Sequence, residues 1–179
     1  MRIEPEFSRP VRVDTLGPAP RCMTIEAGES EREALARRFA LPAIHSLAAE
    51  AGLRRDGETV IAEGRLAAAV TQSCVASGAP VEAVLDEPFR IEFRPHPDAA
   101  PDEEVELGEE EMDVVFYDSA EIDLGEAVAE TLSLSLDPWP RAPEAETVLK
   151  AAGVKEESEA KAEASPFAAL AGLKDKLKP

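Results

Sequence analysis

Three successive segments of the chain alternate between apolar and polar side chains with a period of two. They cover about residues 47–54, 60–71 and 81–94. This period is typical of β-strands that bury one face and expose the other. Turn signals separate the segments, Asp56-Gly57 after the first and Ser77-Gly78 after the second. Because strands joined by short turns pair with their neighbours, the alternation predicts an antiparallel β-meander. The sequence leaves open whether this sheet closes into a barrel.

Helices are expected before and after this meander. Ser30 and Glu33 have the spacing of a capping box, in which each side chain accepts a hydrogen bond from the other residue's amide. Pro42 is expected to end the helix that follows. Asp123 is expected to cap a second helix, which ends before Pro138. The predicted fold class is therefore α+β, an antiparallel β-meander with two main helices and a flexible C-terminal tail.

Two shorter segments outside the meander also have the composition of strands. Residues 10–16 alternate weakly, and a Gly-Pro-rich stretch over 17–20 follows them. Residues 112–117 are mostly apolar and are expected to form a short buried strand.

Length and composition indicate one domain with tails. The chain has 179 residues, of which 44% are apolar, enough for a single core. We expect an α+β domain over residues 1–143, followed by a disordered or frayed acidic linker over 144–164. A short amphipathic helix is expected over 165–179, where Ser165-Pro166 has the pattern of a helix start. The apolar stripe of this helix consists of Phe167, Leu170, Leu173 and Leu177.

The sequence predicts a cytoplasmic protein that does not enter a membrane. Its first residues lack an apolar signal-peptide core, and no stretch approaches the roughly 18 to 20 consecutive apolar residues of a membrane span. Cys22 and Cys74 lie far apart and match neither a disulfide framework nor a zinc-site spacing. Both thiols are therefore expected to be free and reduced.

Negative charge is the strongest signal in the composition. The chain has 19 Lys and Arg against 37 Asp and Glu, a formal net charge of −18, and most of the excess lies within residues 82–126. Such a field repels nucleic-acid phosphates and attracts basic proteins. A simpler interpretation is that the acidity only keeps the protein soluble. The candidate partner-binding carboxylates are those of Asp102, Glu103, Glu104, Glu109, Glu110 and Glu111.

The C-terminal apolar stripe has two possible roles. It could be a tethered docking peptide for the basic protein that the carboxylates bind, or it could pack back on its own domain. The sequence does not decide between them.

Five arginines form the basis of an alternative function, direct binding of RNA. If they gathered on one face, their guanidinium groups could contact several phosphates despite the acidic remainder of the chain. A simpler interpretation is ordinary ion pairing with nearby glutamates. The five are Arg37, Arg38, Arg54, Arg55 and Arg65.

The sequence contains no recognisable catalytic or metal-binding pattern. His45 and His96 have no Cys or His at ligand spacing, and no glycine-rich phosphate loop occurs. We therefore expect a protein that is not an enzyme and uses neither a metal nor another cofactor. A thiol-dependent enzyme with Cys74 as nucleophile is a weaker alternative, because a lone cysteine at a strand end is usually a small buried side chain.

Three pieces of sequence, in this order, resemble the YceD family of large ribosomal RNA subunit accumulation proteins. They cover residues 64–74, 89–93 and 123–138, and a Pro-Trp-Pro-Arg close ends at Arg141. The chain resembles alphaproteobacterial members that lack the Cys-x-x-Cys of many relatives, because Thr71 stands at the first cysteine position. The resemblance therefore implies no zinc. The family-motif positions are Gln72, Cys74, Asp123, Glu126, Glu130 and Pro138.

The resemblance implies a role in ribosome biogenesis, namely accumulation of the large-subunit (23S) ribosomal RNA, without known catalytic residues. Together with the acidic charge, it leads us to expect a non-catalytic factor. The expected partner is a basic ribosomal protein or a large-subunit assembly intermediate. Direct contact with ribosomal RNA through the five arginines is the alternative.

Overall fold

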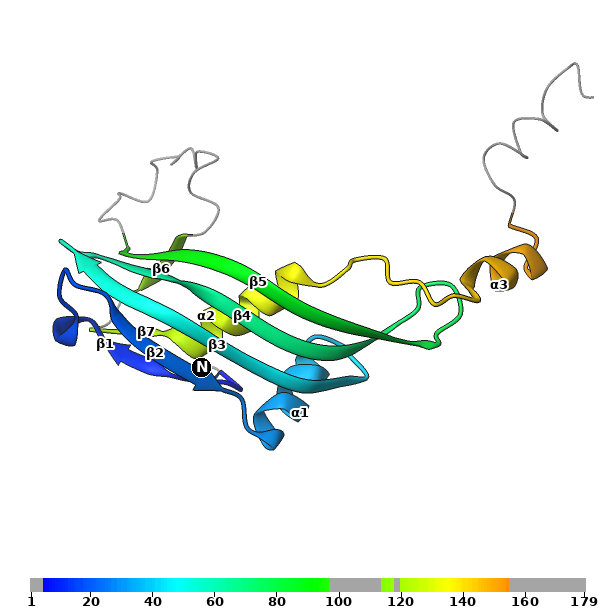
Figure 1. Ribbon diagram of the computed structural model, residues 1–179, viewed down its shortest axis with the longest axis horizontal. Coiled ribbons are helices and arrows are strands. Elements are labelled where there is room, and N and C mark those ends of the chain that lie inside the picture. Colours follow the sequence, from blue (N-terminus) through cyan, green and yellow to red (C-terminus); the bar gives the residue numbers. More distant parts are fainter. Residues whose placement is uncertain (1–4, 97–113, 118–119, 155–179) are drawn as a thin grey trace, which may run out of the picture.

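A five-stranded β-sheet with helices on one face forms the body of the protein (Figure 1). The computed structural model describes residues 5–96, 114–117 and 120–154. The strand order in the sheet is β2-β3-β4-β5-β6. The bounds of these strands are Arg21–Glu26 (β2), Ala43–Asp56 (β3), Thr59–Ser73 (β4), Pro80–Pro95 (β5) and Val114–Tyr117 (β6).

A smaller second sheet and the helices complete the described part of the chain. Strand β1 pairs with β7 in a two-stranded antiparallel sheet, and β7 leads directly into α2. The bounds are Pro10–Arg12 (β1), Glu121–Asp123 (β7), Glu29–Arg38 (α1), Leu124–Ser135 (α2) and Ala145–Ala151 (α3), with a 3-10 turn at Val13–Thr15 (η1).

The predicted α+β class and the antiparallel meander are confirmed. Strands β2, β3, β4 and β5 are antiparallel neighbours in chain order. Gly57 and Gly78 occupy the two turns with φ of 62° and 72°, a left-handed backbone that glycine adopts without steric cost. Among the described strands the sheet stays open, with β2 and β6 at its edges, and does not close into a barrel.

Several element boundaries differ from the sequence-based expectation. The strand expected over 10–16 ends at Arg12, where the 3-10 turn begins, and strands β2 and β7 were not predicted. The strand expected over 112–117 is β6, which is only partly buried and runs parallel to β5. Alternation along one segment reports which face is buried, whereas the direction of pairing depends on a distant partner.

Helix α1 begins and ends earlier than predicted. Its N-cap is Gly28, whose amide donates to the Glu31 carboxylate at 2.7 Å, so the capping box expected at Ser30 and Glu33 is wrong. The helix ends at Arg38, and Ala40 then adopts a φ of 54°, before Pro42 is reached.

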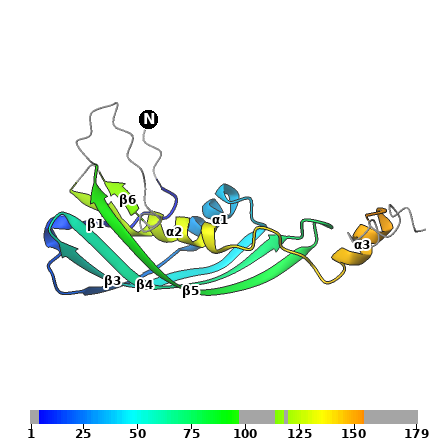
Figure 2. The same ribbon diagram turned by 90° about the horizontal axis from the view of Figure 1, so that it is seen from above.

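Helices α1 and α2 lie on the same side of the curved sheet, here called the inner face (Figure 2). The strands contribute alternate residues to the core on this face, as the period-two pattern predicts. No described helix covers the opposite, outer face. Fully buried core side chains include Phe7, Leu35, Leu47, Leu53, Leu66, Val70, Phe93, Leu124, Val128 and Leu132.

Gly64 lies in the middle of β4 where two backbones approach closely. It pairs in register with Ala51, and a Cβ at this position would lie 2.0 Å from the Glu50 carbonyl oxygen. The absence of a side chain is therefore required by contact with β3. The register between β3 and β4 shifts between Ile44 and Ser46, away from Gly64.

The C-terminal part of the chain is described only up to residue 154. Helix α3 forms the beginning of the segment expected to be a linker, and its Ala145 is buried. The expected domain limits therefore stay a prediction, and the helix expected over 165–179 lies outside the described residues. No helix in the described ranges has the length and apolar character needed to cross a membrane.

Candidate functional site

The Asp123 carboxylate fixes the start of α2 to the N-terminal segment. Its Oδ1 accepts hydrogen bonds from the amides of Gly125 (3.0 Å) and Glu126 (3.1 Å), which confirms the predicted cap. The same oxygen accepts from the Arg9 amide at 2.7 Å, and Oδ2 accepts from the Ser8 hydroxyl at 2.5 Å. One side chain thus satisfies donors from two segments that lie more than a hundred positions apart in the sequence.

Glu126 joins α2 to α1 through Arg38. The guanidinium donates to both carboxylate oxygens of Glu126, at 2.6 and 2.9 Å, and also to Glu6 at 3.0 Å. The hydrogen bond to Glu126 is the main cause that raises the pKa of Arg38 above its ordinary value. Bidentate pairs of this kind hold orientation as well as charge. Arg38, a candidate RNA contact, is therefore already held by two carboxylates.

The segment that follows α2 is fixed along the β4–β5 hairpin by backbone contacts. The Gln72 side-chain amide donates to the Asp137 carbonyl at 2.8 Å, and the Val75 amide donates to the Pro140 carbonyl at 2.9 Å. The Trp139 amide donates to the Asp137 carboxylate at 2.9 Å. These bonds fix the path of the chain on both sides of Trp139 and explain the family-motif position Gln72.

Cys74 belongs to the same junction. Its side chain is buried in a small cluster with Ala142 and Ala145. The Ala142 amide and the Ser77 hydroxyl bond to Sγ, and together they lower the pKa of Cys74 from its ordinary value to about 7. The thiol thus helps to dock the segment after α2 on the hairpin.

We expect the stabilising effect of Cys74 to depend on pH. Because the folded state lowers the pKa of this thiol, the stabilisation is complete above the unfolded pKa near 8.5 and is lost as pH falls through about 7. The melting temperature of the wild type should therefore rise relative to that of Cys74→Ser between about pH 7 and 9. Cys22→Ser, at the exposed cysteine, is the control, and its melting temperature should follow that of the wild type across this pH range. A difference between wild type and Cys74→Ser that stays constant with pH would contradict the role given to the thiolate.

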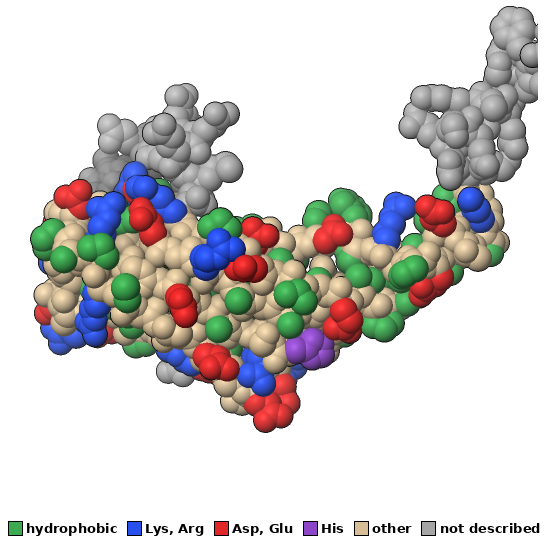
Figure 3. All heavy atoms as spheres, in the orientation of Figure 1, with side chains coloured by type: hydrophobic (Ala, Val, Ile, Leu, Met, Phe, Trp, Pro, Cys, Tyr) green, Lys and Arg blue, Asp and Glu red, His purple; other side chains and the backbone are tan. Residues whose placement is uncertain are grey.

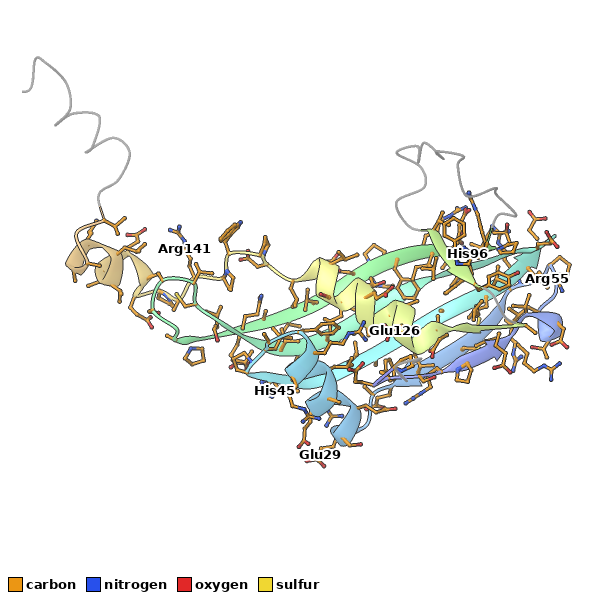
Figure 4. All side chains as sticks on the ribbon, turned by 180° about the vertical axis from the view of Figure 1, so that it is seen from behind. Glu29, His45, Arg55, His96, Glu126 and Arg141 are labelled. Atoms are coloured by element: carbon orange, nitrogen blue, oxygen red, sulfur yellow. The ribbon has the colours of Figure 1, made fainter. Side chains whose placement is uncertain are left out.

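Thr71, at the position of the absent first cysteine, is committed to other contacts. Its hydroxyl donates to Glu82 at 2.9 Å and lies 2.7 Å from His45 Nε2. Within the described ranges, no group of three or more His, Cys, Asp or Glu side chains is arranged to hold a metal ion. His45 and His96 are labelled on separate parts of the sheet in Figure 4.

The structure does not bring the five candidate RNA-binding arginines into one patch. Arg37 and Arg38 end α1 near the start of β3, whereas Arg54 and Arg55 lie near the end of β3, roughly 35 Å along the strand. Figure 4 shows the length of β3 between His45, near its start, and Arg55, near its end. Arg65 lies on β4, paired with Asp86 at 2.8 Å.

The candidate partner-binding residues belong to the acidic loop and to the C-terminal apolar stripe. The acidic residues Asp102, Glu103, Glu104, Glu109, Glu110 and Glu111 and the apolar residues Phe167, Leu170, Leu173 and Leu177 all lie outside the described residues.

Sequence reasoning missed two exposed apolar side chains at the end of α2. Leu134 is 86% exposed and Trp139 is 71% exposed. The available signal was the position of Trp139 between Pro138 and Pro140, which restricts the backbone on both sides of a large aromatic side chain. Glu130, a family-motif position, is also exposed and lies one helical turn before Leu134.

The comparisons with known proteins identify the family. The family described as large ribosomal RNA subunit accumulation protein YceD matches residues 62–174, which is 113 of the 179 residues. Neither the curated proteins nor the solved structures gave a match. The matched range includes most of β4, all of β5 and α2, and the segment with Trp139. The chain therefore belongs to the YceD family of large ribosomal RNA subunit accumulation proteins.

Proposed function

We propose that this protein is a non-catalytic ribosome-biogenesis factor, which supports accumulation of 23S ribosomal RNA by binding a basic ribosomal protein or a basic assembly intermediate. Family membership supports the role in large-subunit RNA accumulation. The choice of a basic protein over RNA as the direct partner rests on the distribution of charge.

The observation that carries this choice is that carboxylates neutralise most of the arginines on the surface. Figure 3 shows basic side chains beside acidic ones over the face it presents. Such pairs leave little positive potential for a phosphate backbone. The ion pairs are Arg9–Glu31, Arg12–Asp14, Arg38 with Glu6 and Glu126, Arg54–Glu63, Arg65–Asp86, Arg90 with Glu63 and Glu92, and Arg94–Glu92.

An excess of negative charge remains after this pairing. The described residues contain 21 Asp and Glu against 13 Lys and Arg, a net charge of −8, before the acidic segment 97–113 is added. A surface of this sign speeds encounter with basic proteins and slows encounter with RNA.

The weaker alternative of a thiol-dependent enzyme finds no support in the position of Cys74. The thiol is buried at the hairpin, whereas a hollow of about 440 Å³ lies between α1 and the start of β3. That hollow is lined by Glu29, Arg32, Glu33, Arg37 and His45, among others, and not by either cysteine. We expect Cys74→Ser to restore growth and ribosome content fully in cells that lack the gene.

The test is a comparison of two ligands for the full-length protein at about 150 mM salt. One ligand is the protein fraction extracted from purified large ribosomal subunits, separated into its components. The other is a 23S ribosomal RNA transcript. We expect at least one basic protein to bind with a Kd in the micromolar range or below, and the RNA to bind far more weakly.

The opposite result would favour the alternative function. In that case the protein would bind the RNA with an affinity that falls steeply with salt, and it would bind no extracted protein. Replacing Arg37, Arg54 and Arg55 by alanine would abolish the RNA binding. Arg38 is not suited to this test, because its replacement would also break the link between α1 and α2.

A further inference from the structure

The exposed face of α2 combines acidic and apolar side chains in one stripe, and the segment after the helix adds an exposed tryptophan. Glu126, Glu130 and Leu134 are spaced four residues apart, so they lie above one another on the helix surface. The inward-facing positions of α2, including Val128 and Leu132, are buried against the sheet. The stripe therefore faces away from the core.

Trp139 follows α2 and is an exposed side chain on a pre-organised backbone. The residue is 71% exposed, but its backbone is fixed by the hydrogen bond to Asp137, and the next residue is held by the bond from Val75 to Pro140. The flanking prolines restrict the backbone further. An exposed aromatic side chain on a rigid backbone loses little conformational entropy on binding, which is the property of residues that dominate interface energetics.

The charge around these apolar side chains selects the chemistry of the partner. Within residues 124–142 the acids are Glu126, Glu130 and Asp137, and the only base is Arg141. Arg38 pairs with Glu126 and Glu6, so Glu130 and Asp137 are the carboxylates of this face that form no ion pair with a described residue.

We propose that Leu134 and Trp139, together with the carboxylates of Glu130 and Asp137, form a docking surface for a basic protein segment. This docking surface rests on the proposed function and names the place where the basic partner binds. Lysine or arginine side chains of the partner pair with the carboxylates, while their aliphatic stems cover Leu134 and a cationic group lies over the Trp139 ring.

The chain provides its own spectroscopic probe for this surface, since Trp139 is its single tryptophan. Full-length protein labelled with 5-fluorotryptophan gives one fluorine signal, which reports the environment of this ring. On titration with the basic protein extracted from large ribosomal subunits, we expect the signal to shift and broaden. Trp139→Ala should weaken binding of the same protein at least tenfold.

Matched variants separate the docking surface from general effects. Val84 is 85% exposed but lies on β5 with its side chain on the outer face, so Val84→Ala should leave the Kd unchanged. Glu130→Lys should weaken binding, whereas Glu26→Lys, the same charge change at the edge strand β2, should have a much smaller effect. Thermal unfolding followed by circular dichroism checks that each variant is folded.

The possible failures are distinguishable. Binding of the basic protein with an unchanged fluorine signal and an unchanged Kd for Trp139→Ala would overturn the docking surface and leave the proposed function intact. Failure of the wild type to bind any extracted protein would overturn the proposed function itself. If deletion of residues 160–179 shifts the signal of the free protein, the chain's own tail covers the surface, and this result would also overturn the proposal.

Discussion

Replacing Gly125 by alanine is expected to destabilise the protein by about 2–4 kcal/mol, which corresponds to a fall of about 10 °C in Tm. A Cβ at this position would lie 2.2 Å from the Phe7 carbonyl oxygen and 3.0 Å from the Arg9 amide nitrogen. Both are backbone atoms, and the bond from the Arg9 amide to Asp123 fixes them in place. The N-terminal segment would have to move away from α2 to accommodate the methyl group.

Helix propensity alone predicts the opposite sign for this substitution. Alanine is about 1 kcal/mol more favourable than glycine inside a helix. The steric overlap exceeds this gain, because a contact near 2 Å cannot be relieved by rotation of a side chain. Gly52→Ala is the matched control, since its Cβ would meet the Pro20 side chain at an ordinary 3.6 Å. Equal melting temperatures for Gly125→Ala and Gly52→Ala would show that the close contact is not a constraint on folding.

Replacing Asp123 by alanine is expected to cost about 3 kcal/mol of stability. The substitution leaves four donors without their acceptor, namely the Ser8 hydroxyl and the amides of Arg9, Gly125 and Glu126. Two of these bonds cap α2, and the other two hold the N-terminal segment. We therefore expect both the start of the helix and the β1–β7 pair to lose protection in hydrogen exchange.

Asp137→Ala is the control for Asp123→Ala. Asp137 follows α2, is exposed, and its carboxylate accepts a hydrogen bond from the Trp139 amide. Its removal should cost less than about 1 kcal/mol. Asp123→Asn should fall between wild type and Asp123→Ala, because the amide oxygen can still accept at the cap without the negative charge. If chemical denaturation gives similar stabilities for Asp123→Ala and Asp137→Ala, the central role assigned to Asp123 is wrong.

The sequence predicted strands best where the alternation of apolar and polar residues within one strand shows which face is buried. Strands β3, β4 and β5 are long, and each buries alternate residues, so the pattern within each segment sufficed to predict them. Strands β2 and β7, which were not predicted, are short, and their existence depends on partners elsewhere in the chain. A two-stranded pair such as β1 with β7 joins segments about 110 positions apart, and no local pattern predicts such a pairing.

The same division applies to the candidate site. Asp123 was predicted to cap α2, because the cap is local, whereas its bonds to Ser8 and Arg9 could not be foreseen. Likewise, the sequence suggested five arginines as one patch, but it could not show that Arg38 is held by Glu126 from a helix 88 positions away. Side-chain type indicates which interactions are possible, and the fold determines which partners are within reach.

The exposure of Trp139 is the clearest case. An isolated tryptophan in a chain with few aromatic residues is expected to be buried in the core. Here Gln72 and Val75 hold the backbone on both sides of this residue on the hairpin, which leaves the ring outside. The exposure of Trp139 therefore follows from the geometry of its backbone and not from the hydrophobicity of its side chain.

The central claim, support of large-subunit ribosomal RNA accumulation, is tested most directly by the ratio of 23S to small-subunit ribosomal RNA in cells that lack this gene. Mature and precursor species should both be quantified, with the intact gene returned as the control. The account predicts a selective fall in the large-subunit species that the intact protein reverses. A ratio that stays unchanged in cells without the gene would contradict it.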